Sequence, residues 1–244
     1  MAKSFIDIHT HLLPQTDDGT RSMKESLACF EKAIELGFQT IVLTPHYLSG
    51  VNYDYDTNLR IFRILSKKVR KKNIPVQLIL ASEVMLSDDI IDNLMNKKIA
   101  TINQSQYLLV EMPMYNNGYD VKNTIYQLKE KKYIPVIAHP ERCDYFQNDL
   151  TKIDNLLKMG VVFQLNAASL FGLYGKTARE TARYLLKHKK IHLIASDAHS
   201  INAYDSLEKT IKYVTKLYGE KTCELLFSIN PQAIINNKEV VKMK

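Results

Sequence analysis

Short apolar runs alternate along the chain with longer segments in which apolar residues recur at helical spacing. The apolar runs predict seven strands, at residues 5–11, 40–46, 76–84, 106–113, 135–142, 161–170 and 191–200. The intervening segments predict helices at residues 22–37, about 57–72, after Ser87, near 121–132, at 152–160, at 177–190 and from about Tyr204. Because no linker-like composition separates these units, they predict one α/β domain over residues 1–244 with a parallel, barrel-like sheet.

Polar side chains of two chemical types gather where the predicted strands end. The strand-end residues are His9 and His11, His46, Glu83, Glu111, His139, and Asp197 with His199. Asp18 lies in the loop after the first strand. The carboxyl ends of parallel barrel strands converge on one face, so we expect these nine side chains to share one cavity.

This set of side chains predicts a metal centre with more than one ion. A lone histidine at a strand end is ordinarily structural, but His9 and His11 are two residues apart and face the same side of a strand. Clustered carboxylates repel one another and take up protons unless a cation neutralises them. Imidazole and carboxylate ligands without thiolate suit manganese, iron or zinc and disfavour a structural zinc site.

Cysteine usage and charge narrow the class of protein. Cys29, Cys143 and Cys223 are widely spaced and odd in number, which does not suggest a disulfide framework. None of them precedes a phosphate-binding loop, so cysteine-based phosphatase chemistry is not expected. The net charge of +7 fits either a lysine-rich solvated surface or attraction to anionic partners. With neither a signal peptide nor a membrane-inserting run visible, a cytoplasmic location is expected.

The motifs around the strand ends resemble a known superfamily. DIHTH, TPH, the isolated Glu83, VEMP, AHPER and SDAH, in this order, resemble the PHP (polymerase and histidinol phosphatase) superfamily. Within it, DIHTHLLPQTDDGTRSMKESL, TPHYLSG, EMP and HPER are similar to the manganese-dependent protein tyrosine phosphatases of bacterial capsule and exopolysaccharide systems. The resemblance covers nearly the whole chain.

The resemblance implies a distorted seven-stranded (β/α) barrel, similar to a TIM barrel, that holds three Mn²⁺ ions. By position, the first ion would be held by His9, His11, Glu83 and Asp197. Glu83 would bridge to the second ion, which Glu111 and His139 complete, and Asp18, His46 and His199 would hold the third. Asp17 is not among these ligands and would lie either behind them, in contact with a ligand, or in the loop.

The resemblance also implies residues that act on substrate. Arg142, three residues after His139, would fork onto a phosphoryl oxygen, and Asp197 or His199 would assist the leaving group. Relatives carry a further arginine shortly after the last metal histidine. This chain has Tyr204 near that place, so either Tyr204 or a lysine such as Lys209 is expected to bind substrate instead.

The implied function is hydrolysis of phosphotyrosine on a protein, with a membrane-associated bacterial tyrosine kinase as the expected substrate. Alternatives are a small-molecule phosphatase, such as one for histidinol phosphate, and a metal-dependent nuclease. A non-catalytic binding module would not need all nine ligands. The chain shows no stripe of aromatic and basic residues of the kind that tracks a nucleic-acid strand, so no nucleic-acid partner is expected.

Overall fold

The computed structural model describes residues 4–113, 115 and 118–244, and within them nine strands form two sheets. The three-stranded sheet has the order β1 (Phe5–Thr10), β2 (Phe38–Leu43), β4 (Gln77–Leu80). The six-stranded sheet has the order β3 (His46–Tyr47), β5 (Glu83–Met85), β6 (Tyr107–Glu111), β7 (Ile134–Ala138), β8 (Val162–Asn166), β9 (Leu193–Ala195). Every neighbouring pair is parallel, which confirms the α/β prediction.

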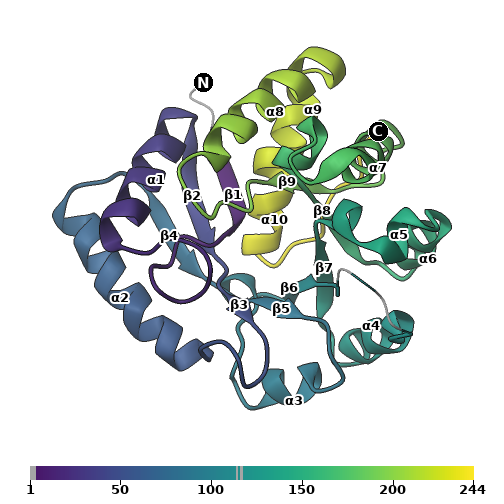
Figure 1. Ribbon diagram of the computed structural model, residues 1–244, viewed down its shortest axis with the longest axis horizontal. Coiled ribbons are helices and arrows are strands. Elements are labelled where there is room, and N and C mark those ends of the chain that lie inside the picture. Colours follow the sequence, from purple (N-terminus) through teal and green to yellow (C-terminus); the bar gives the residue numbers. More distant parts are fainter. Residues whose placement is uncertain (1–3, 114, 116–117) are drawn as a thin grey trace.

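Helices surround the strands, as Figure 1 shows. The α-helices are α1 (Met23–Glu35), α2 (Tyr55–Lys71), α3 (Ile90–Met95), α4 (Val121–Glu130), α5 (Asp144–Gln147), α6 (Thr151–Lys158), α7 (Gly175–Lys187), α8 (Ala203–Tyr218), α9 (Glu220–Glu224) and α10 (Asn230–Ile235). Short 3-10 turns are η1 (Ile102–Gln104), η2 (Pro140–Arg142) and η3 (Ala167–Phe171), and η4 (Leu225–Ile229) is a π-helical turn. Among the described residues, no helix has the length and apolar character required to span a bilayer.

The predicted count of seven strands is wrong, because two of the predicted strands are each divided. The run at 40–46 forms β2 and β3, separated at Thr44 and Pro45. Proline has no N–H with which to continue a strand ladder. The Thr44 hydroxyl also replaces a backbone acceptor, because it accepts the N–H of Thr10 in β1 at 3.1 Å. The run at 76–84 divides in the same way into β4 and β5.

The two sheets join through backbone hydrogen bonds at the carboxyl ends of their strands. The N–H of His11 donates to the carbonyl of Ala198 at 2.8 Å, and the N–H of Asp197 donates to the carbonyl of His9 at 3.0 Å. On the other side the chain itself links the sheets, because β2 leads into β3 across residues 44–45 and β4 leads into β5 across residues 81–82. The breaks in the strands therefore lie where the predicted ligands are.

One apolar cluster gathers side chains from both sheets. Strands from both sheets contribute to it, including β1 through Ile8, β2 through Val42 and β7 through Val136. Ile234 and Ile235 of α10 pack against the same cluster, and Figure 1 shows α10 near the middle of the molecule. Because the opposite faces of the strands are covered by the outer helices, the strands are buried on both sides and read as nearly continuous apolar runs.

His192, just before β9, is a buried histidine outside the predicted metal centre. Its Nδ1 accepts the N–H of Phe163 at 3.1 Å, which requires that nitrogen to be unprotonated. Burial, with the nearby charge of Lys242, lowers the pKa of His192 to about 4. An unfolded histidine titrates near 6.5. The folded state therefore favours neutral His192, and the stability this supplies is present above pH 6.5 and lost as the pH falls toward 4.

We expect His192→Asn to flatten the dependence of unfolding free energy on pH. Asparagine keeps an acceptor near the Nδ1 position and does not titrate. Between pH 7 and pH 5, urea unfolding in the presence of EDTA should show a loss that is smaller by about 2 kcal/mol in the variant than in the wild type. The exposed His188, changed to Asn, is the matched control. Equal pH dependence in all three proteins would contradict this account of His192.

Candidate metal centre

All nine predicted ligands lie at one end of the strands, and contacts join them into a single cluster. Six come from strands or positions directly after them, namely His9, His11, His46, Glu83, Glu111 and His139. Asp197 and His199 follow β9, and Asp18 lies in the loop before α1. Three subsets approach closely enough to hold an ion: His9 with His11 and Glu83; His46 with Glu83 and Glu111; and His11 with Asp18, His46 and His199.

Glu83 is the centre of the cluster. Its side chain is fully buried, and Oε2 lies 3.1 Å from a nitrogen of each of His9, His11 and His46. None of these three approaches has hydrogen-bond geometry, so Oε2 is a buried oxygen without a hydrogen-bond partner. The other oxygen, Oε1, lies 3.0 Å from Nε2 of His139.

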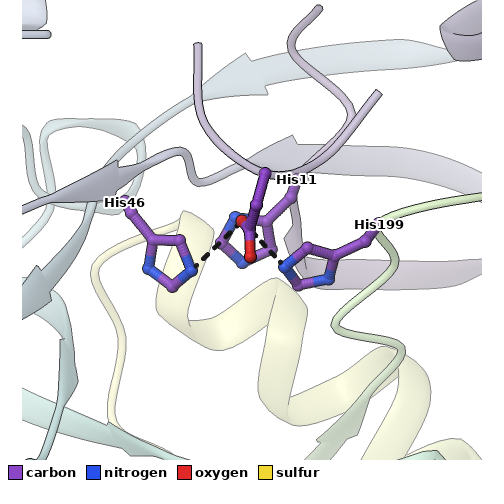
Figure 2. Close-up of side chains that lie close together, drawn as sticks. His11, His46 and His199 are labelled. Atoms are coloured by element: carbon purple, nitrogen blue, oxygen red, sulfur yellow. Dashed lines mark ion pairs between the residues drawn. The ribbon is translucent and has the colours of Figure 1, made fainter. Parts of the chain in front are cut away.

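A second group of imidazoles surrounds Asp18, nearer to solvent. Figure 2 shows His11, His46 and His199 converging from three separate segments of the chain. Oδ1 of Asp18 lies 3.3 Å from Nε2 of His199 and 3.7 Å from Nε2 of His46. The Asp18 side chain is 70% exposed, so this group forms the open side of the cluster. Since His46 is close to both Asp18 and Glu83, proximity does not fix how the ligands are shared among ions, and the three-ion distribution stays a prediction.

Irregular backbone aims several of these side chains. In the pairing of β1 with β2, Asp7 is opposite Ile41 and Thr10 is opposite Leu43, so β1 holds one extra residue just where His9 lies. Such bulges redirect side chains and are common beside active sites. His139 and Asp197 adopt positive φ angles of 31° and 52°, a conformation that is uncommon outside glycine and often found at functional sites.

The DDG segment, residues 17–19, folds back onto His11. The N–H of Thr20 donates to the carbonyl of His11 at 3.0 Å, and a Cβ atom on Gly19 would lie only 1.8 Å from that carbonyl oxygen. Asp17 accepts from Nδ1 of His11 at 2.7 Å and from the N–H of His46 at 3.0 Å. Asp17 thus lies behind the ligands, one of the two places the sequence left open, and it directs Nε2 of His11 toward Glu83.

Two amide side chains of β8 also hold predicted ligands in place, and the sequence analysis did not identify either of them. Nδ1 of His9 donates to Oε1 of Gln164 at 2.9 Å, which leaves Nε2 of His9 as the metal-facing nitrogen. Nδ2 of Asn166 donates to Oδ2 of Asp197 at 2.8 Å. Their signal in the sequence is two amides at alternate positions of an otherwise apolar strand, which places both on the same side.

The pKa values in the cluster record its excess of buried charge. Although burial opposes ionisation, His9 and the neighbouring imidazoles hold the pKa of Glu83 well below its usual range. Burial likewise opposes charge on His9, yet Glu83 and Asp197 raise its pKa to about 9. Burial and the charge of Glu83 raise the pKa of Glu111. Burial also opposes charge on His11 and His46, yet the surrounding carboxylates raise the pKa values of both, so the carboxylates favour positive charge beside them.

Divalent cations fit this arrangement. Among the described residues, Oε2 of Glu83 is a buried oxygen with converging imidazole nitrogens and no hydrogen-bond donor, so a divalent cation would supply the charge it lacks. Gln164 and Asp17 fix the tautomers of His9 and His11 that leave Nε2 unprotonated for a metal. The donor set contains nitrogen and oxygen without sulfur, as predicted.

Arg142 lies at the edge of the cluster and contacts it through Asp197. Its Nη1 donates to Oδ2 of Asp197 at 2.8 Å, and its side chain is 18% exposed. The guanidinium packs over the ring of Tyr174, 4.3 Å from the ring centroid, and the Tyr174 hydroxyl lies 3.4 Å from Nδ2 of Asn166. Arg142 is therefore fixed from two sides while part of it stays accessible.

Tyr204 does not lie where a substrate-binding residue must. Its side chain is fully buried in the core at the start of α8, and burial with the neighbouring charge of Asp7 raises its pKa well above the usual range. A side chain with no exposed surface cannot contact a substrate, so the predicted substrate-binding role of Tyr204 is wrong. Lys209, the alternative, is exposed on α8.

A parallel α/β fold with a buried imidazole–carboxylate cluster is the arrangement of a metal-dependent hydrolase. The chain belongs to the capsular polysaccharide synthesis CpsB/CapC family, whose model matches residues 5–236. It is 28% identical to the tyrosine-protein phosphatase YwqE of Bacillus subtilis, over 97% of this chain and 94% of that protein. It is 34% identical to the putative tyrosine-protein phosphatase CapC of Staphylococcus aureus, over 80% of this chain and 77% of that protein.

Solved structures agree with the sequence comparison. A crystal structure from work on YwqE of Bacillus subtilis and CpsB of Streptococcus pneumoniae, described as metal-dependent tyrosine phosphatases, superimposes with a TM-score of 0.90. The match has 28% identity and covers 98% of this chain and 97% of that chain. The resemblance inferred from the motifs is therefore confirmed for the family and for the parallel α/β class of the fold.

We expect Glu83→Gln to abolish tight manganese binding while leaving the fold intact. The amide keeps the shape of the side chain but removes the shared negative charge. Wild type should gain about 2.7 kcal/mol of stability at a Mn²⁺ concentration 100-fold above the dissociation constant, and the variant should gain much less. Thermal unfolding with and without Mn²⁺, and metal analysis after gel filtration, measure this. Glu141→Gln, at another fully buried glutamate, should behave like wild type, and equal metal content in Glu83→Gln would refute the central role of Glu83.

Gly19→Ala should impair both stability and metal binding. The added methyl group forces the DDG segment away from His11, with an expected loss of about 1–3 kcal/mol in unfolding free energy. Asp17 and Asp18 move with the segment, so the affinity for Mn²⁺ should fall. The matched control is Gly50→Ala, where φ is +75° and a methyl group meets nothing within 4 Å. This control should lose stability without losing metal affinity. Unchanged Mn²⁺ affinity in Gly19→Ala would contradict the prediction.

Proposed function

We propose that this protein is a metal-dependent tyrosine-protein phosphatase that hydrolyses phosphotyrosine on proteins in capsule or exopolysaccharide synthesis. The observation that carries the proposal is Arg142, held 2.8 Å from Asp197 at the edge of a cluster of imidazoles and carboxylates. Membership of the CpsB/CapC family and the tyrosine-protein phosphatases among its relatives support the same activity.

Three Mn²⁺ ions are the proposed cofactors, with iron or zinc as alternatives. The proposed ligands of the first ion are His9, His11, Glu83 and Asp197. Glu83, Glu111 and His139 would hold the second, and Asp18, His46 and His199 would hold the third. Bound metal ions supply Lewis-acid stabilisation of the phosphoryl oxygens and activate water as the nucleophile.

The chain's own residues orient the phosphate and manage protons. Arg142 has a planar fork of donors that matches two phosphoryl oxygens, and its packing on Tyr174 reduces the freedom lost when it binds them. Nδ1 of His199 is hydrogen-bonded to the carbonyl of Asp197 at 2.9 Å, which leaves Nε2 toward the open side of the cluster. Asp197 and His199 are the proposed proton-handling groups, but a tyrosyl leaving group, with a pKa of ~10, needs less protonation than an alkyl alcohol.

The substrate we propose is a membrane-associated bacterial tyrosine kinase, and the place of the reaction that we propose is the cytoplasm.

We also propose that residues 1–244 form one domain and that the two sheets together make a distorted barrel. The parallel bridge between Thr10 and Ala198 and the shared apolar cluster inside the strands support the barrel. The exposed side of the cluster at Asp18 supports access by a side chain presented on another protein.

Arg142→Lys should reduce kcat/KM for a phosphotyrosyl peptide by about 10²- to 10³-fold, because lysine keeps the charge but loses the fork. The measurement is phosphate release by metal-stripped protein refilled with Mn²⁺. Arg63→Lys on the outer surface of α2 is the matched control and should have wild-type activity. Activity of Arg142→Lys within threefold of wild type would remove Arg142 from phosphate binding.

The same assay separates the proposed activity from its competitors. Histidinol phosphate and a phosphoserine peptide are tested beside the phosphotyrosyl peptide, with Glu83→Gln as the metal-site control. Release from phosphotyrosine that disappears in Glu83→Gln supports the proposal. Release from histidinol phosphate alone would move the protein to small-molecule metabolism, and release from none of them would make nucleic acids the next substrates to test.

A further inference from the structure

The segment between β8 and α7 exposes an unusual run of apolar side chains. Phe171 is 40% exposed, Leu173 is 70% exposed and Tyr174 is 36% exposed, so three of four consecutive residues present apolar surface. Gly172, at a φ of 86°, ends η3 and turns the chain outward between them. We call residues 171–174 the apolar loop.

The apolar loop is continuous with the phosphate end of the candidate active site. The Tyr174 ring lies against the guanidinium of Arg142, with 4.3 Å between the guanidinium carbon and the ring centroid. Through Asn166, the same loop is also tied to Asp197. Leu173 directly precedes Tyr174, so the most exposed residue of the loop is one position from the residue that packs on Arg142.

Single exposed apolar residues are common on proteins and require no explanation. Ile64 on α2 and Leu217 on α8 are of this kind, since each is an isolated exposed residue on a helix surface. Phe171, Leu173 and Tyr174 differ because they are grouped and adjoin a site. Grouped apolar surface beside a binding site is typical of a recognition surface, where its removal from water contributes to affinity.

We propose that the apolar loop binds an apolar side chain that flanks the phosphotyrosine in a protein substrate. This inference rests on the proposed phosphatase function and names the sequence context of its substrate. With the phosphate at Arg142, a residue next to the phosphotyrosine packs on Leu173 and Phe171. A small phosphate ester has no flanking residue, so it gains nothing from this surface. Three side chains are too few for a stable dimer, which needs roughly 800 Å² from each partner, but they suit a short peptide segment.

The test compares two phosphotyrosyl peptides of equal length and charge, one with leucine and the other with serine on both sides of the phosphotyrosine. Free phosphotyrosine is the third substrate and reports on the chemistry alone. The proteins are the Mn²⁺-loaded wild type, Leu173→Ser and the control Leu217→Ser, in which a residue of similar exposure, 56%, is changed on α8. Light scattering gives the mass of each protein.

We expect wild type and Leu217→Ser to show a kcat/KM about fivefold higher for the leucine peptide than for the serine peptide. Leu173→Ser should lose this preference through a higher KM, with kcat and the hydrolysis of free phosphotyrosine unchanged.

Four results would overturn the inference while leaving the proposed function intact. The first two are equal hydrolysis of both peptides by wild type and an undiminished preference for the leucine peptide in Leu173→Ser. The third is a loss of activity in Leu173→Ser that is as large on free phosphotyrosine as on the leucine peptide, which would mean that Leu173 acts through the catalytic site. A lower molecular mass of Leu173→Ser would instead assign the loop to self-association and would also overturn the inference. Failure of wild type to hydrolyse any of the three substrates would overturn the proposed function and this inference together.

Discussion

The buried carboxylate of Glu83 imposes the constraint on which the rest of the site depends. Removing a charge from water is costly unless opposite charge and hydrogen bonds compensate for it. In this protein the compensation comes from His9, His11, His46 and His139, whose ring nitrogens lie within 3.1 Å of one or other oxygen of Glu83. These imidazoles come from β1, β3 and the end of β7, so the charge of one side chain is balanced only when both sheets are assembled.

Support for the cluster comes from residues that do not belong to it. Asp17 accepts a hydrogen bond from Nδ1 of His11 and Gln164 accepts one from Nδ1 of His9, while Asn166 donates to Oδ2 of Asp197. The positive φ of Asp197 costs conformational energy, which the hydrogen bond from its N–H to the carbonyl of His9 helps to offset. The large apolar cores on both sides of the strands keep this irregular backbone in place.

Exposure differs between the parts of the site. Glu83 and His9 are fully buried, Arg142 is partly accessible and Asp18 is 70% exposed. Asp197 connects the two ends, because one of its oxygens faces the histidines while the other binds Arg142. Arg142 is thus coupled to the histidines through Asp197, and the ring of Tyr174 packs against its guanidinium.

The sequence alone determined the α/β class, the position of most helices and the nine side chains of the cluster. This was possible because strand periodicity fixes where each strand ends, and parallel strands bring those ends together. It did not determine that the runs at 40–46 and 76–84 would break, since the breaks depend on contacts with β1 and on the junction between sheets. Tyr204 is the clearest case. Its place in the chain suited substrate binding, but the packing of α8 turns it into the core beside Asp7. Local patterns specify which element a residue joins, whereas neighbours from distant segments decide what its side chain touches.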